Sequence, residues 1–373
     1  MADITAPWAA GTAGALAGTV RHVIEVRANH PSWAEPIPLD LETGTILYDE
    51  NQVPHVTAQM TLKTSPGFDL DPRLGIRIEI DAGYIVNGVR DVHRMADLWL
   101  WEYTDRRPSN LIDLLAYSME SRIMGWMPLG GSGQSFSSTS LAGDSITSLL
   151  HWALPSAVVV NDMHAATFVT GGAFLNVGTG DNVWSAIYDI ADRAGGGWVY
   201  EDGLGVWHVT DRPEAAGQSA AILKTGVGGT ITRHDTEMSL ERWYNAVLVE
   251  HSWYDGEQRT AQGWAEITSG PLRVAAVGRR VLKVTREYKG DSATARSSAS
   301  SIVARTVTRG RGVALSIGGA PYWVRPGATV TIQVGDAPQE RQLISSIQFS
   351  LAATGTANIV TRLPEDVTIT TGA

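Results

Sequence analysis

The feature that constrains the fold of this chain most is an alternating run at positions 75–86. Three isoleucines alternate there with three charged residues: Ile76, Arg77, Ile78, Glu79, Ile80 and Asp81. Because successive side chains of a strand point to opposite faces, this period of two predicts a strand with one buried face. Runs at 23–26 and 56–62 predict further strands, and Asn87-Gly88 predicts a turn. We therefore expect a β domain over residues 21–105, after an N-terminal arm of residues 1–20.

A second region of strands begins near residue 216. Its candidate strands are residues 246–250, 281–285, 329–334, 343–351 and 356–361. Between them, residues 295–307 (ARSSASSIVARTV) are predicted to form one helix, whose small side chains suit close packing on a sheet or on a neighbouring chain. A chain of 373 residues is long enough for two or three domains. We expect residues 216–373 to form a second β domain.

The intervening segment, residues 106–215, has the pattern of a mixed α/β domain. One helix is predicted after Ser109, because apolar residues then recur at the spacing of one helix face. These residues are Leu111, Leu114, Leu115, Met119 and Ile123. A second helix is predicted to begin at Asp181 and to end at Gly195, since glycine is the residue typical of helix C-termini.

The stretch GGGWVYEDGLGVWHV, residues 195–209, follows that second helix. Asp202-Gly203 predicts the turn of a β-hairpin. Trp198, Tyr200 and Trp207 then lie on the two arms, where packing against the preceding helix is the commoner use of such residues. The alternative is an aromatic platform that binds a glycan, with these three residues as its contacts.

No motif in the chain assigns a reaction. There is no cysteine, which excludes disulfides and thiolate zinc sites, and no two of the nine histidines have the spacing of a helical metal pair. The sequences of a phosphate-binding loop, a nucleophile elbow and a dinucleotide fingerprint are all incomplete. We predict no cofactor, no metal and no catalytic residue. A catalytic pair of carboxylates remains an open alternative, because the two carboxylates of a glycosidase are defined by their distance in the folded chain and not by their spacing in the sequence.

Charge is distributed unevenly along a chain of net charge −10. Residues 25–105 hold fourteen carboxylates and six cations, whereas residues 273–311 hold ten cations and two carboxylates. These segments are either two solvated faces or two complementary surfaces that meet in a head-to-tail subunit contact. A nucleic-acid groove is a third interpretation, opposed by the acidic chain and by the lack of aromatic stacking residues among the cations. The candidate subunit-interface residues are Arg279, Arg280, Arg305 and Arg309.

The order of the predicted elements resembles that of the minor tail proteins of long-tailed phages, of the tail-tip or baseplate hub type, especially in phages of actinobacteria. The resemblance spans about residues 20–365 and rests on five segments in sequence. They are DLDPRLGIRIEI, DNVWSAIYDIADRAGGGWVYEDGLGVWHVTDRP, RWYNAVLVE, VRPGATVTI and RQLISSIQFSLAATGTANIVTRLP.

This resemblance implies a mainly β fold with an α+β insertion: two tail-tube-like β-barrel domains that flank a smaller α/β decorating domain. It also implies a homotrimeric structural hub at the distal end of the virion tail, which adapts a sixfold tube to a threefold tip. Its partners would be the distal tail protein, the tape measure protein and tip or fibre proteins, with no specific nucleic acid and no membrane span. Relatives can carry a peptidoglycan hydrolase, for which we expect no room after the last strand. The alternative function is a tail protein that binds cell-wall carbohydrate or degrades peptidoglycan.

Overall fold

The structure is a computed structural model, and it describes most of the chain after residue 19. The described residues are 20–63, 70–131, 133–137, 139–165, 175–194, 196–238, 240–241, 243–287, 289–307, 311–352, 354–363 and 367–372. Residues 1–19 of the predicted arm, Gly195 at the predicted helix end and the candidate interface residue Arg309 lie outside these ranges.

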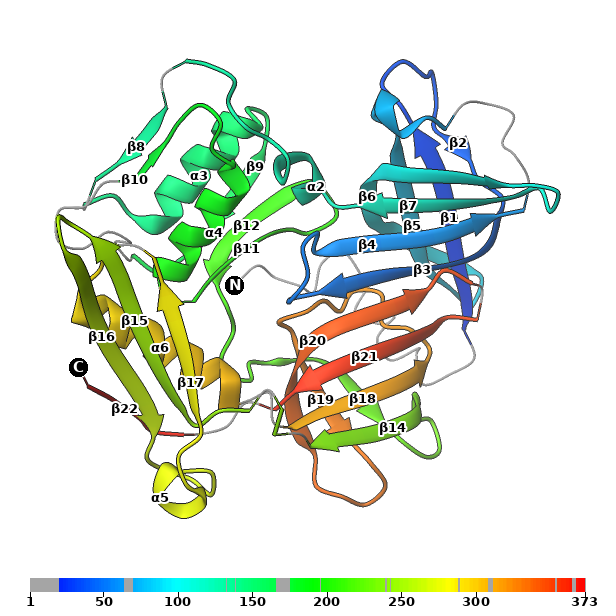
Figure 1. Ribbon diagram of the computed structural model, residues 1–373. Helices are drawn as coiled ribbons and strands as arrows, with labels where there is room; N and C mark the ends of the chain where they lie inside the picture. The colour runs from blue at the N-terminus through cyan, green and yellow to red at the C-terminus, as the bar shows by residue number, and fades with distance from the viewer. Residues whose placement is uncertain are drawn as a thin grey trace.

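One sheet of thirteen strands makes up the right half of the molecule in Figure 1. Its first group of strands is β1 (Arg21–Asn29), β2 (Ile37–Pro38), β3 (Leu41–Asp49), β4 (Val56–Leu62), β5 (Arg77–Val86), β6 (Val89–Arg106) and β7 (Leu111–Tyr117). Its second group is β13 (Ser219–Lys224), β14 (Ile231–Met238), β18 (Arg311–Gly318), β19 (Thr329–Gln333), β20 (Glu340–Ser350) and β21 (Thr356–Arg362). The two groups are joined where β3 pairs with β20.

The strand predicted from the alternating isoleucines is confirmed as β5, which follows the short 3-10 turn η1 (Pro72–Leu74). Ile78 and Ile80 are fully buried in the core of the large sheet, and burial of each such side chain contributes about 1.5–3 kcal/mol. On the opposite face, Glu79 and Asp81 are also buried and are paired with arginines of the neighbouring strands, Arg27 and Arg94. Both faces of β5 are therefore covered, one by apolar side chains and one by ion pairs.

The contact between β3 and β20 makes the two strand groups one structural body. Tyr48 lies opposite Ile347 in the register, and its ring makes an edge contact with Phe349 at 6.2 Å. Close by, Arg362 Nε donates to Glu50 Oε1 at 2.9 Å, with side chains only 9% and 4% exposed. One apolar core runs through both groups. The prediction of two β-barrels is not confirmed, because none of the sheets formed by the described strands closes on itself.

Part of the second β segment forms a separate four-stranded sheet. Its strands are β15 (Ala246–Tyr254), β16 (Gln258–Ile267), β17 (Val281–Arg286) and β22 (Ile369–Gly372), with the short helix α5 (Val274–Val277) between β16 and β17. The small-residue helix is confirmed as α6 (Ser292–Val307), which packs on this sheet. A Cβ at Gly263 would lie 2.3 Å from the backbone N of Arg296, so the helix rests directly on β16. Small residues are therefore what this contact requires.

The α/β segment lies above that four-stranded sheet in Figure 1. Its helices are α2 (Glu120–Ile123), α3 (Ala142–Ala153) and α4 (Val183–Arg193), and its strands are β8 (Gln134–Phe136), β9 (Val158–Asn161), β10 (Leu175–Val177), β11 (Gly197–Glu201) and β12 (Val206–Asp211). The predicted second helix and hairpin are confirmed as α4 and β11–β12, although Asn182, and not Asp181, caps the helix.

The helix predicted after Ser109 is wrong. Its first half is the strand β7, which pairs with β4 and β6 in the large sheet, and only Glu120–Ile123 is helical. Ile112 and Leu114 face the core with a period of two. Over so short a run, the leucine spacing fits both a helix face and a strand, and pairing with two neighbouring strands decided between them.

Candidate interaction surface

The β11–β12 hairpin connects the α/β segment to the large sheet. The carbonyl oxygen of Gly203, in the hairpin turn, accepts a hydrogen bond from the backbone N of Asp97 at 2.5 Å. Gly203 has a φ of 84°, and a Cβ there would lie 3.3 Å from a methyl group of Val56. Glycine is therefore required for the turn to approach the large sheet so closely.

The aromatic side chains of this hairpin serve as packing. Trp207 is fully buried and Trp198 is 6% exposed. Tyr200 stacks on Trp198 with ring centroids 4.1 Å apart, and on His208 with centroids 5.0 Å apart. The residues proposed as glycan contacts thus do not present the open ring faces that stacking on a sugar requires.

Two buried carboxyl groups meet where the hairpin contacts α2. Glu120 and Glu201 are each 1% exposed. Glu120 Oε1 accepts hydrogen bonds from the backbone N of Glu201 at 2.9 Å and of His55 at 3.4 Å. Glu120 Oε2 has no donor within the described part of the chain. Glu201 Oε2 accepts from the backbone N of Met119 at 2.9 Å, and Oε1 accepts from that of Gly205.

The pKa of both carboxyls is raised. Burial, and after it the charge of Glu120, raises the pKa of Glu201 to about 8. Burial also raises the pKa of Glu120, and it lowers the pKa of the adjacent His55 to about 3, so that this ring is neutral. A carboxyl pair of raised pKa is what the glycosidase alternative predicts. Here, however, both groups are closed to solvent and bonded to backbone, so they hold the hairpin on α2 and are not accessible to a polysaccharide.

The structure places two of the predicted interface residues, Arg279 and Arg280, side by side in the connection between α5 and β17. Arg279 pairs with Glu266 at 2.6 Å while its side chain stays 58% exposed. Arg280 lies over the ring of Tyr244, 5.5 Å from the centroid. Both arginines border the groove described below, but Arg279 is already paired with a carboxylate of its own chain.

Arg305, the third described candidate, does not line that surface. Arg305 donates to the carbonyl oxygen of Ser301 at 3.3 Å. It lines a small cavity of about 120 Å³ between α4, the hairpin and α6, together with Trp198 and Arg212. Arg309 is outside the described residues. Of the three described candidates, two therefore border the groove and one lines a different cavity.

Most charges of the acidic and basic segments are paired within the chain. In the basic segment, further ion pairs join Lys283 to Glu250, Arg286 to Asp192, Lys289 to Asp255 and Arg311 to Glu340. In the acidic segment, the carboxylates that contact a basic side chain are Glu25, Asp40, Glu42, Glu50, Asp71, Glu79, Asp81, Asp91, Asp97 and Asp105. These internal ion pairs reduce the electrostatic attraction expected between the acidic segment of one copy and the basic segment of another.

A few charged side chains of these segments make no ion pair with any described residue. They include Arg273, Arg280 and Arg296 in the basic segment and Glu35, Asp49 and Glu102 in the acidic segment. Such groups are the ones still available to an opposite charge on another molecule.

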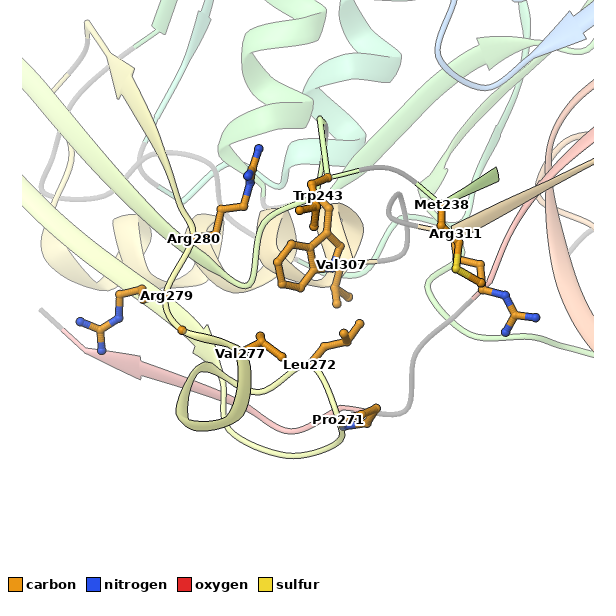
Figure 2. A pocket seen from close by; sticks show the side chains of 11 residues that line it. Met238, Trp243, Pro271, Leu272, Val277, Arg279, Arg280, Val307 and Arg311 are labelled. Atoms are coloured by element: carbon orange, nitrogen blue, oxygen red, sulfur yellow. The ribbon is translucent and has the colours of Figure 1, made fainter. Parts of the chain in front are cut away.

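Arg279 and Arg280 border a groove of about 770 Å³, shown in Figure 2. Trp243 and Val307, both buried, lie at its centre, and Leu272 and Val277 face them from the loop around α5. The guanidinium groups of Arg279, Arg280 and Arg311 point away from this apolar centre in three directions (Figure 2). An apolar centre within a charged rim is the anatomy of a protein–protein contact surface.

The walls of the groove expose large apolar side chains to solvent. Met238 is 72% exposed, Leu240 62% and Val277 52%. Single exposed apolar residues are ordinary, but a contiguous rimmed group of them marks an interaction site. No sequence pattern marks these residues, because they lie at a strand end and in short connections, and only the fold brings them beside the arginines.

Other kinds of site receive no support in the described part of the chain. There, no group of three or more histidine, aspartate and glutamate side chains is arranged to hold a metal ion. Nor does any described helix have the length and apolar composition needed to cross a bilayer.

The fold is that of phage tail proteins. No protein-family model and no curated protein matches the chain, but solved structures match it over most of its length. The tail protein from Neisseria meningitidis MC58 is 14% identical, with a TM-score of 0.64 over 93% of this chain and 97% of that one. The 43 kDa tail protein of prophage MuSo2 from Shewanella oneidensis is 13% identical, with a TM-score of 0.63 over 91% of this chain and 98% of that one.

A third similar structure comes from a secretion system. The E. coli c3393 protein is described as a component of the type VI secretion system that is structurally similar to the T4 bacteriophage tail proteins gp27 and gp5. It is 9% identical to this chain, with a TM-score of 0.50 over 91% of this chain and 77% of its own. The resemblance to phage tail proteins that the sequence suggested is thus confirmed for the fold.

Proposed function

We propose that this protein is a structural component of a phage tail, namely the homotrimeric hub at the tail tip. The observation that carries the proposal is the likeness of fold to two tail proteins over more than nine-tenths of both chains. The open groove with exposed apolar walls supports it, because an assembly protein needs contact surfaces that its own chain leaves free.

The division of the large sheet suits an adaptor between two symmetries. Each chain contributes two groups of strands, one on each side of the β3–β20 pairing. If each group occupies one position of a ring, three copies supply six positions, so that a threefold hub can adjoin a sixfold tube. The proposed location is the distal end of the virion tail, where the hub closes or continues the channel. The proposed partners are the distal tail protein, the tape measure protein and tip or fibre proteins.

The proposed role is non-enzymatic. The alternative, binding of cell-wall carbohydrate or degradation of peptidoglycan, depends on exposed aromatic rings or on an accessible carboxyl pair. Trp198 and Trp207 are buried, and so are Glu120 and Glu201. Arg279 and Arg280 stay in the proposal as subunit-interface residues because both border the groove.

The first test is the solution mass of the purified protein by light scattering at two salt concentrations. A hub predicts a mass of about 120 kDa, three times the 40.0 kDa chain. Part of that assembly should dissociate at high salt, because exposed charge pairs are screened. A monomer at every protein concentration would overturn the homotrimeric hub.

A further inference from the structure

An unusual tryptophan lies on the outer face of β6. The register between β6 and β7 shifts between Leu100 and Glu102, so that Trp101 is the extra residue of a β-bulge. Trp101 is 52% exposed, and its ring contacts that of Tyr117 with centroids 5.7 Å apart. Bulges redirect side chains, and a half-exposed indole is the kind of residue that dominates binding energy in protein interfaces.

The residue next to this indole is one of the few carboxylates that the chain leaves available. Glu102 is exposed and makes no ion pair with any described residue. Trp101 and Glu102 thus form a compact pair of an apolar ring and a free negative charge, here called the anchor. Glu35 is also exposed and without a described ion pair, but its neighbours Ala34 and Pro36 offer no large ring.

The groove has the complementary chemistry. Its apolar centre is large enough for an indole, since about 770 Å³ lies within the range of pockets that hold small organic ligands, roughly 300–1,000 Å³. Arg280 on its rim has no carboxylate among the described residues, whereas the neighbouring Arg279 is paired with Glu266. Arg280 of the groove and Glu102 of the anchor therefore carry opposite charges, and each lies beside an apolar surface.

We propose that the Trp101–Glu102 anchor of one copy docks in the groove of a second copy, with the indole against Leu240 and Val277 and the carboxylate facing Arg280. The contact joins copies head to tail, because β6 and α5 lie on opposite sides of the molecule in Figure 1. Such a heterologous contact uses two different surfaces and repeats until a ring closes. This inference rests on the self-assembly proposed above and names the surfaces that carry it.

The first experiment separates the two surfaces. Trp101→Ala removes the anchor and keeps the groove, while Leu240→Glu blocks the groove and keeps the anchor. Each variant alone is expected to stay near the 40.0 kDa of one chain by light scattering. In an equimolar mixture, each pair of one Trp101→Ala chain and one Leu240→Glu chain has a single intact groove and a single intact anchor. Association should therefore stop at a dimer of about 80 kDa, twice the chain mass.

Controls keep this result interpretable. Tyr254→Ala removes another exposed ring, 76% exposed on β15, and should leave the wild-type mass unchanged. Circular dichroism spectra should match wild type for all variants, since each changes an exposed side chain. If the wild type assembles and either the anchor or the groove variant keeps its mass, the docking proposal is wrong and the hub proposal stands. If the wild type is a monomer throughout, both proposals fail.

A charge exchange tests the second half of the contact. Glu102→Arg and Arg280→Glu are each expected to weaken association at least tenfold. The chain that carries both changes should recover most of it, because the opposite charges then meet with their positions exchanged. Glu35→Arg is the matched control and should have no effect. The assignment of Glu102 and Arg280 as partners would be overturned if the folded double variant did not recover association. It would also be overturned if Glu35→Arg weakened association as much as Glu102→Arg does.

Discussion

The hairpin and the groove each contain a buried tryptophan, but they differ in what surrounds it. At the hairpin, Trp207 and two buried carboxyls hold the α/β segment together, and a glycine turn joins it to the large sheet within one chain. At the groove, Leu240 and Val277 are exposed, and Arg280 is left without a carboxylate among the described residues. The first surface is satisfied by its own chain, and the second is open.

An interface between chains therefore differs from one within a chain in having exposed apolar side chains and charges that the chain itself leaves unpaired. A buried tryptophan occurs in both regions, Trp207 at the hairpin and Trp243 in the groove, and so decides nothing by itself. The hairpin should therefore control the stability of the folded chain, and the groove should control association with little effect on stability. Four predictions test this comparison, in order of the expected change in the free energy of unfolding.

Replacement of Trp207 should cause the largest change. Trp207→Ala removes a fully buried indole from the core of the α/β segment, and such substitutions cost about 3–5 kcal/mol. Chemical denaturation should show this loss. A variant with wild-type stability would mean that the hairpin is not a packing element.

Glu120→Gln should change how stability depends on pH. The pKa of Glu201 is raised from its usual 4.5 to about 8. Between those values the unfolded chain has released a proton that the folded chain retains, so stability falls as the pH rises through this window. Glutamine keeps the oxygen that accepts from His55 and Glu201 and replaces Oε2, which accepts nothing among the described residues.

Removing the Glu120 charge should thus flatten this fall. We expect Glu120→Gln to be more stable than wild type by on the order of 2 kcal/mol above pH 8, and no more stable near pH 4. Thermal unfolding from pH 4 to pH 9 measures both limits, with the exposed Glu35→Gln as control. Parallel pH profiles for Glu120→Gln and wild type would show that the two carboxyls are not coupled.

Gly203→Ala should have a smaller effect on the same contact. It places a Cβ at a φ of 84° and 3.3 Å from Val56, which costs about 1 kcal/mol in strain. Hydrogen exchange at the amide of Asp97, which donates to the Gly203 carbonyl, should become faster. As a matched control, Gly205→Ala, also at positive φ but with open space around its Cβ, separates backbone strain from the close approach.

Leu240→Ser in the groove should have the smallest effect on stability. Leu240 is 62% exposed, and exposed positions away from special features change stability by less than about 0.5 kcal/mol. Its solution mass should nevertheless fall, since the serine removes an apolar wall of the groove. A loss of stability as large as that of Trp207→Ala would show that the groove belongs to the core and not to an interface.

Much of the secondary structure could be predicted from residue patterns. The period-two run became β5, the glycine-rich stretch became a hairpin, and the small-residue segment became α6 on a sheet. These elements carry their pattern within a few residues, because side-chain direction in a strand or helix follows from local backbone geometry. The candidate site was only partly predictable: Arg279 and Arg280 were selected from charge, whereas Leu240, Val277 and Trp101 were not selected.

Tertiary contacts determine which elements and which charges become partners. They made β7 a strand, by offering the edges of β4 and β6 to a run that also fitted a helix. They joined two predicted β domains through β3 and β20, and they moved β15 and β17 to a separate sheet. They also paired most of the segregated charges within the chain, leaving Glu102 and Arg280 free of described ion pairs. The physical reason is that strand pairing, ion pairing and burial join residues far apart in sequence, whereas a sequence pattern reports only on neighbours.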